Sequence, residues 1–239
     1  MGELNKKPIH NVFKDYRKMN LVNPYRFKSS LPIATILNRY KFEDDVTDSV
    51  GGQDGTPTAI TYTTNGVGKS GVFNGTTSNV NLPSQLISGT DSFSLSAIVN
   101  FNVLTTRQDL FSTNGPLHSV LFRLHESKAM QSIIYTTDGI FAIMATTLCN
   151  NINQNYHFIT TYDGINLKVY LDGALVGSVS ATGTIVTGGS NSKLGAILTS
   201  IPPLNRLNGK LDEVIVWNYT LTDDECLDLA NQQLAGIEI

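Results

Sequence analysis

Apolar and polar residues alternate in short segments through most of the chain from residue 31 onward. In the segment 92–101 we expect one apolar face, because side chains along a strand alternate between its two faces. The residues on that face are Phe93, Leu95, Ala97 and Val99. Comparable strand patterns occur at 34–43, 59–64, 72–75, 79–83, 119–127 and 130–147. Segments rich in Gly, Asn, Asp and Ser separate them, and this arrangement is typical of an all-β sandwich or barrel.

The segment 155–180 predicts three antiparallel strands in a meander. Two Asp-Gly pairs, at 163–164 and 172–173, interrupt its alternating pattern. Glycine accepts a positive φ without a Cβ clash, so Asp-Gly suits a tight hairpin. We therefore expect strands at 158–162, 167–171 and 175–179. His157 has no acidic or nucleophilic neighbour in the sequence, and we interpret it as a hydrogen-bonded structural residue rather than as a ligand or base.

One helix is predicted near the end of the chain, at about 223–234. Thr222 is followed three residues later by Glu225, which is the spacing of a capping box. Leu221 before the cap and Cys226 inside the helix are placed to form a hydrophobic staple. We expect this short helix to lie against one end of the sandwich.

Charge is unevenly distributed along the 239 residues. The whole chain has a formal net charge of −3, yet residues 1–30 hold seven Lys and Arg against two acidic residues. The sequence thus indicates a basic N-terminal arm, 1–30, on an acidic body, 31–239. An acidic body argues against a nucleic-acid groove on the main domain. No apolar run is long enough to cross a membrane, and Cys149 and Cys226 are expected to be reduced, packed thiols.

The arm also contains several aromatic residues. A purely solvated tail would be poorer in aromatics, so we expect the arm to pack on its own body, on a sister subunit or on another protein. An acidic protein surface and nucleic acid are both possible attractors for its charge, and a solvated tail is the alternative. The predicted partner-binding residues are Phe13, Tyr16, Arg17, Tyr25, Arg26 and Phe27.

Several segments together resemble the laminin G type of concanavalin A-like jelly-roll domain. "YHFITTYDGINLKVYLDGALVGS" is similar to the signature hairpins of that family. "YKFEDDVTDSVGGQDGTPTAITY", "GVGKSGVFNGTTSNVNLP", "FSLSAIVNF" and "LNGKLDEVIVWNYTLTDDE" resemble other family segments, in the correct order. Asn155 and Ile98 stand where the family usually has tryptophan. The resemblance covers about 31–239 and implies a two-sheet antiparallel jelly-roll sandwich.

The resemblance implies some chemistry and excludes other kinds. Glycosidases of this superfamily have a Glu-x-Asp-x-x-Glu strand, and this sequence has none, so we expect no catalysis. A structural Ca²⁺ near a sheet edge is common in related domains. Asp48 and Asp54 in the loop "DSVGGQDG", with Asp212 on the last strand, are the predicted ligands. The alternative is that these carboxylates cap turns. No other cofactor is expected.

Sugar binding, the function that this family most often has, usually needs exposed aromatic rings. Trp217 lies in the apolar strand "VIVWNY" and is expected in the core. Tyr135, Tyr170 and Phe141 are the surface candidates, and nothing in their sequence context distinguishes them.

Our first functional hypothesis is a non-catalytic structural or display protein of a phage virion: a capsid decoration protein, head fibre or tail adhesion subunit. The sequence starts at Met1 without an export signal, which suits assembly in the host cytoplasm. The arm would bind other virion proteins or a second copy of the chain, and the sandwich would present a lectin-like surface to a cell-surface glycan. A bacterial glycan-binding module without a virion role is the alternative, and a glucanase-type enzyme is a third possibility.

Overall fold

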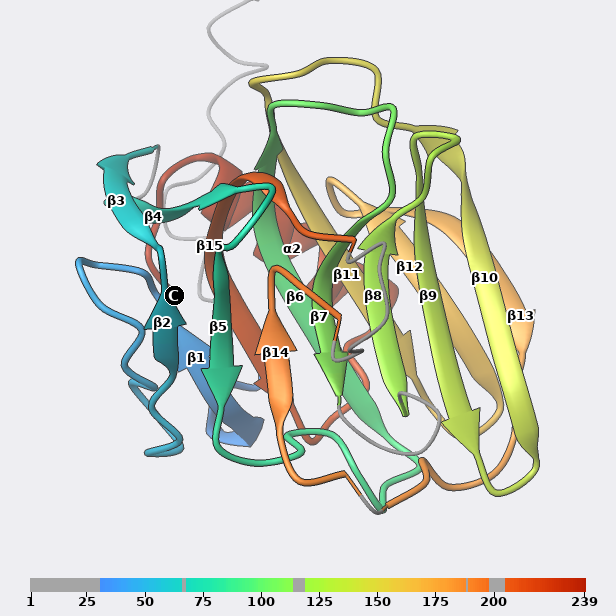
Figure 1. The fold of residues 1–239 in the computed structure, drawn as a ribbon. Coiled ribbons are helices and arrows are strands. Elements are labelled where there is room, and N and C mark those ends of the chain that lie inside the picture. Colours follow the sequence, from blue (N-terminus) through green and yellow to red (C-terminus); the bar gives the residue numbers. More distant parts are fainter. Residues whose placement is uncertain (1–30, 66–67, 114–118, 188, 198–204) are drawn as a thin grey trace, which may run out of the picture. The chain divides into compact units, whose positions relative to one another are not determined.

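A computed structural model describes residues 31–65, 68–113, 119–187, 189–197 and 205–239. In this part of the chain two antiparallel sheets pack face to face, as the sequence predicts (Figure 1). The predicted arm, 1–30, lies outside the described residues. Among these residues, no helix is long and apolar enough to span a membrane.

The first sheet has eight strands, and in Figure 1 it is the farther one. Its order is β13-β12-β11-β6-β15-β4-β3, and β1 also pairs with β15. The bounds are β1 Ile36–Tyr40, β3 Thr61–Thr64, β4 Lys69–Asn74, β6 Phe93–Phe101, β11 Asn155–Tyr162, β12 Asn166–Leu171, β13 Ala174–Ser180 and β15 Asn208–Trp217. A 3-10 turn, η2 (Ile33–Thr35), precedes β1.

The second sheet has seven strands in the order β10-β9-β8-β7-β14-β5-β2. Its bounds are β2 Thr56–Thr58, β5 Asn79–Leu82, β7 Gln108–Thr113, β8 Val120–Leu124, β9 Ala129–Thr136, β10 Gly139–Leu148 and β14 Ser192–Leu194. The sequence pattern did not predict β2, β7 or β14. All six residues of β7 are buried, so this strand lacks the apolar–polar alternation that a half-buried strand shows.

The main core lies between the two sheets. Phe93, Leu95, Ala97 and Val99 of β6 all belong to it, which confirms the predicted apolar face. Phe158 of β11 contacts the ring of Phe122 of β8 edge to face, with the ring centroids 6.3 Å apart.

The predicted meander is confirmed as β11, β12 and β13. Leu171 pairs with Ala174 across a two-residue turn formed by Asp172 and Gly173. Both turn residues have positive φ, 51° and 82°, which is the backbone of a type I′ hairpin. A Cβ on Gly173 would lie 2.9 Å from the Cα of Leu227, so this turn also needs glycine in order to pass the C-terminal helix.

The helix α2, Asp223–Leu234, has the bounds and the capping box that the sequence predicts. Cys226 and Leu229 pack with Ile159 and Tyr170 on the outer face of the eight-stranded sheet, so the helix lies behind that sheet in the view of Figure 1. Cys149 and Cys226 are both buried free thiols.

His157 lies fully buried on β11, near α2. Neither ring nitrogen has a partner at strict hydrogen-bond geometry, but the side chain of Gln233 lies close enough to act on the ring as a hydrogen-bond partner. The position is structural, as expected. Burial lowers the pKa of His157 to about 4, against a smaller opposing effect of Gln233. The ring is therefore neutral in the fold at pH 7.

A neutral buried histidine makes folding depend on pH. The unfolded chain takes up a proton at His157 near pH 6.5 and the folded chain only near pH 4, so stability falls as the pH drops through that window. The His157→Gln variant lacks this dependence. We expect the stability difference between wild type and variant to change by about 3 kcal/mol from pH 7 to pH 4.

Urea unfolding of both proteins at several pH values measures this change. Burial raises the pKa of Asp109 to about 7 and that of Asp212 to about 9. These two carboxyls titrate in the opposite sense, but they are present in both proteins and cancel in the comparison. Parallel stability profiles of the two proteins would contradict a neutral His157.

Candidate functional site

The loop between β1 and β2 is held by one buried carboxylate, Asp48. Its Oδ1 accepts hydrogen bonds from the backbone N–H groups of Arg39, Val50 and Gly51, at 2.9, 3.1 and 3.0 Å. Its Oδ2 accepts from Asn38 Nδ2 at 2.7 Å and from the N–H of Gln53 at 3.0 Å. The carboxylate thus ties the loop to strand β1.

The loop is closely packed at Gly51, and its hydrogen bonds keep Asp48 ionised. A Cβ on Gly51 would lie 2.2 Å from the carbonyl oxygen of Leu37, so only glycine fits there. Burial alone would raise the pKa of Asp48, but the hydrogen bonds from Asn38, Arg39, Gly51 and Gln53 outweigh it and lower the pKa. Asp48 is therefore an ionised cap of the loop.

Beside this loop lies an open hollow of about 490 Å³, which we call the Tyr62 hollow. The loop forms one side of it, and the segment from β2 to β3 forms the other. Its lining residues are Asp44, Asp45, Val46, Thr47, Asp54, Gly55, Pro57, Ile60 and Tyr62.

The apolar part of the Tyr62 hollow rests on the main core. Val46 is buried, and Ile60 and Tyr62 are partly buried and pack against the core residues. Burial raises the pKa of Tyr62, and the negative charges of Asp45 and Asp44 add to the effect. The phenol is therefore neutral and lies close to two carboxylates.

The acidic part of the hollow is exposed. Asp45 Oδ1 accepts from the N–H of Thr47, and Asp54 Oδ1 accepts from the N–H of Asp48, both at 2.9 Å. The second oxygen of each carboxylate has no hydrogen-bond partner within the described part of the chain. An aromatic ring beside acceptor oxygens can bind a molecule that combines C–H surface with hydroxyl groups.

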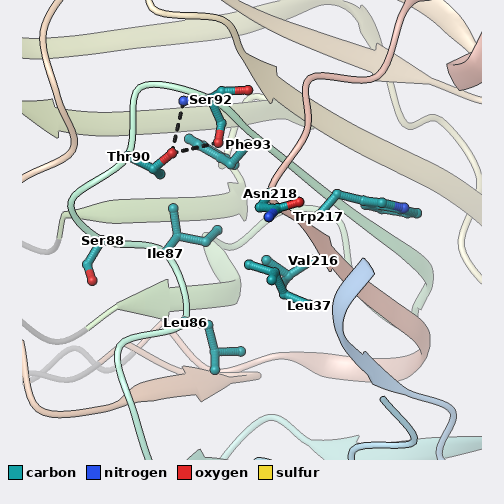
Figure 2. A pocket seen from close by; sticks show the side chains of 10 residues that line it. All are labelled: Leu37, Leu86, Ile87, Ser88, Thr90, Ser92, Phe93, Val216, Trp217 and Asn218. Carbon is teal, nitrogen blue, oxygen red and sulfur yellow. Dashed lines mark hydrogen bonds between the residues drawn. The ribbon is translucent and has the colours of Figure 1, made fainter. Parts of the chain in front are cut away.

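A second hollow, of about 230 Å³, lies between the β5–β6 connection and the end of β15. Figure 2 shows the indole of Trp217 directed away from the other lining side chains, and this ring belongs to the buried cluster under α2. Thr90 Oγ1 and Ser92 bond to one another, and Ser92 Oγ is 2.9 Å from Thr220 Oγ1. This hollow presents apolar side chains and largely satisfied hydroxyls, so it suits a polar ligand less well.

Asp212 lies on β15, where the strand bulges between Asp212 and Ile215. The carboxyl group is buried, and its Oδ1 accepts from the N–H of Glu213. Glu213 itself forms a buried ion pair with Arg39, with Arg39 Nε 2.8 Å from Glu213 Oε2. Burial, and then the charge of Glu213, raise the pKa of Asp212, so it is protonated at pH 7.

The predicted calcium ligands are therefore only partly brought together. Asp48 and Asp54 lie in one loop and are joined by a hydrogen bond. Within the described ranges, no group of three or more His, Cys, Asp or Glu side chains is arranged to hold a metal ion. The geometry of Asp48 supports the alternative of a turn cap, and calcium binding stays a prediction.

A family model described as the concanavalin A-like lectin/glucanases superfamily matches residues 74–226, more than half of the chain. The chain belongs to this superfamily. The resemblance found in the sequence is thereby confirmed at the level of the superfamily. No curated protein sequence matches the chain.

Solved structures of the same fold agree with this assignment to the superfamily. One is domain 4 of AbnA, an extracellular arabinanase of Geobacillus stearothermophilus, in complex with arabinotriose, with a TM-score of 0.62 and 24% identity over 82% of this chain and 98% of that chain. Another is the binding domain of Paraclostridial Mosquitocidal Protein 1, with a TM-score of 0.68 and 16% identity; the match covers 85% of this chain and 55% of that chain. A third belongs to botulinum neurotoxin type C, whose cell entry depends on two ganglioside molecules. Its TM-score is 0.64 at 10% identity, and the match covers 83% of this chain and 51% of that chain.

The chain spans about half of the two toxin chains. At these identities the likeness shows the fold alone.

The structure rules out one of the aromatic residues predicted to bind sugar, Tyr170, and adds Tyr62 as a candidate. Tyr170 was a surface candidate for sugar binding, but it is fully buried under α2, and its hydroxyl donates to Asp223 Oδ1 at 2.7 Å. Tyr135 and Phe141 are half-buried, and Trp217 is in a buried cluster as expected. Sequence reasoning missed Tyr62, although it stands in a β-branched run directly after the acidic loop.

The six predicted partner-binding residues of the arm, Phe13, Tyr16, Arg17, Tyr25, Arg26 and Phe27, lie outside the described residues.

The Asp48→Asn variant should lower the free energy of unfolding by about 1–3 kcal/mol, because an amide replaces one acceptor oxygen by a donor and leaves buried N–H groups unpaired in either orientation. Thermal unfolding measures this loss. Asp45→Asn is the matched control, because it keeps the one oxygen that accepts from Thr47. If the predicted calcium site forms, chelator lowers the wild-type melting temperature, because a ligand bound only by the folded state stabilises it. Identical curves with Ca²⁺ and with chelator would leave Asp48 as a turn cap alone. Stabilisation by Ca²⁺ that is lost in Asp48→Asn would contradict the turn-cap role and support the predicted metal site.

Proposed function

We propose that this chain is a non-catalytic carbohydrate-binding module and that the Tyr62 hollow is its binding site. The observation that carries the proposal is the combination of a partly buried aromatic ring with two exposed carboxylates, each with one unused oxygen, on a fold of this superfamily. Sugars offer both hydroxyl donors and apolar C–H faces. Tyr62, Ile60 and Pro57 supply a surface for the C–H face, and Asp45 and Asp54 accept hydrogen bonds from hydroxyls.

Related structures support the same class of function. The arabinanase domain is bound to arabinotriose in its structure, and the cell entry of botulinum neurotoxin type C depends on two ganglioside molecules. Both proteins contain a domain with this fold.

The ionisation of the buried carboxyls supports a role without catalysis. A glycosidase needs a carboxylic acid of raised pKa that its substrate can reach, with a second carboxylate nearby. Within the described ranges, the aspartates whose pKa is raised to about 7 or above are Asp109 and Asp212. Both are buried and they lie on strands of different sheets, β7 and β15. Neither is reachable, and the two do not face one common substrate.

Replacing Tyr62 by alanine tests the proposed site. We expect Tyr62→Ala to weaken binding to an oligosaccharide by roughly 2- to 12-fold, because the ring supplies the apolar contact, and aromatic contacts contribute about 0.5–1.5 kcal/mol. A glycan array followed by calorimetry measures the effect. Tyr135→Ala, a half-buried tyrosine on the other sheet, is the matched control and should bind as wild type. Equal losses in both variants would argue against this hollow.

A more specific role, display on a phage virion, rests on the sequence of residues 1–30 with its basic and aromatic residues. In that role the arm anchors the sandwich to other virion proteins or to a second copy, and the module presents its hollow to a cell surface. The proposal accounts for a basic segment, 1–30, whose charge is opposite to that of the acidic body, 31–239.

Deleting residues 1–30 should leave the melting temperature of the sandwich nearly unchanged and abolish self-association or attachment to the particle. Sedimentation velocity and co-sedimentation with particles measure the two effects. Replacing Phe13, Tyr16, Tyr25 and Phe27 by alanine should reproduce the loss with little dependence on salt. Neutralising the basic residues should weaken attachment and remove its dependence on salt, because exposed charges are screened. Normal assembly of the truncated protein would show that the arm is a solvated tail.

A further inference from the structure

The described charged residues that line the Tyr62 hollow are all acidic. Among the described residues, nine line it; three are aspartates, Asp44, Asp45 and Asp54, and none is Lys or Arg. All three aspartates are exposed. The neighbouring cation, Lys69, pairs with Asp44 and is not part of the lining.

The hydrogen-bonding capacity of the carboxylates points the same way. An ionised carboxylate only accepts hydrogen bonds, and Asp45 and Asp54 each have an oxygen without a partner in the described chain. Such oxygens require donors, which hydroxyl and ammonium groups supply. An acidic group on the ligand would bring further acceptors. In the part of the lining that the structure describes, the side-chain donors are the hydroxyls of Thr47 and Tyr62.

Hydrogen bonds to the backbone hold the carboxylates of Asp45 and Asp54, which form the rim of the hollow, in place. Asp45 is bonded to Thr47 N–H and Asp54 to Asp48 N–H, and Asp48 in turn is held by strand β1 through the N–H of Arg39. The rim carboxylates therefore cannot easily turn away from an approaching anion. Because the repulsion between like charges acts over several ångströms even in water, each rim carboxylate disfavours a bound anion.

We propose that the Tyr62 hollow selects glycans without acidic groups: it binds uncharged and amino sugars and rejects uronic, sialylated and sulfated ones. This inference rests on the proposed function and adds to it the charge class of the ligand. It also separates this chain from the similar neurotoxin, because gangliosides are sialylated glycolipids.

Matched pairs of ligands test the proposal. The probes are cello-, manno- and galacto-oligosaccharides, each compared with its C6-oxidised uronate, and arabino- and xylo-oligosaccharides, each compared with its sulfated form. Within a pair the sugar backbone is the same, and the acidic group is the one substituent that differs. For every uncharged probe that binds, we expect the acidic partner to bind at least about tenfold more weakly at low salt, with a smaller gap at high salt because the repulsion is screened.

Charge-neutralising variants connect the discrimination to the hollow. In the double variant Asp45→Asn/Asp54→Asn each residue keeps a carbonyl oxygen for its backbone N–H, so the loop keeps its shape. The affinity ratio between the uncharged and the acidic probe should fall toward one. Asp91→Asn is the matched control, because it removes one exposed charge in the β5–β6 connection, outside this hollow, and should leave the ratio unchanged.

The outcomes separate this inference from the proposed function. Binding of uncharged probes with rejection of the acidic partners, and loss of that rejection only in the double variant, would support the inference. Equal or tighter binding of the acidic probes, weakened by Tyr62→Ala, would overturn the inference and leave the function standing. Failure of every probe to bind would overturn both.

Discussion

The loop that carries the candidate site depends on the carboxylate of Asp48, which accepts five hydrogen bonds from Asn38, Arg39, Val50, Gly51 and Gln53. Four of these donors are backbone N–H groups, so a single side chain replaces the hydrogen bonding that a strand would otherwise provide. A loop without such an anchor would leave the same groups to water and sample many conformations. Because Asp54 is bonded to the N–H of Asp48, the rim of the hollow takes its position from the same anchor.

The central strand β6 of the eight-stranded sheet is covered on both faces, and this explains which sequence predictions succeeded. All nine residues of β6 are buried. Phe93 and Leu95 could be assigned to the core because apolar residues alternate along this strand. The small or polar residues between them gave no sign that α2 and other segments cover the outer face. Tyr170 was placed on the surface for this reason: it does point away from the main core, but the direction of a side chain does not tell what packs over it.

Local signals were therefore sufficient for the hairpins, the helix and its cap. The Asp-Gly turn at 172–173 and the pair Thr222 and Glu225 act over a few residues, and their geometry follows from those residues alone. The site needed more distant information. The sequence placed Asp48 and Asp54 in one loop, but the bulge at Asp212 depends on the pairing of β15 with β6. The ion pair of Glu213 joins it to Arg39, which is 174 residues away in the sequence. The contribution of Tyr62 likewise depends on β3 lying beside the acidic loop.

An open hollow would enclose only part of a bound sugar, so we expect a single site of this kind to bind weakly. Side chains of the buried core cannot contact a ligand, so specificity must come from the loops that the fold holds in place. Here the loop contributes charge and acceptors, which discriminate between ligands more than they add affinity. If residues 1–30 join copies of the chain on a larger particle, many weak sites act together, and linking them can raise the overall affinity by about 10²–10⁴ without any new contact. In the proposed role, a weak, charge-selective hollow and an anchoring arm would be complementary: the hollow would select the surface, and the number of copies would determine how tightly the surface is bound.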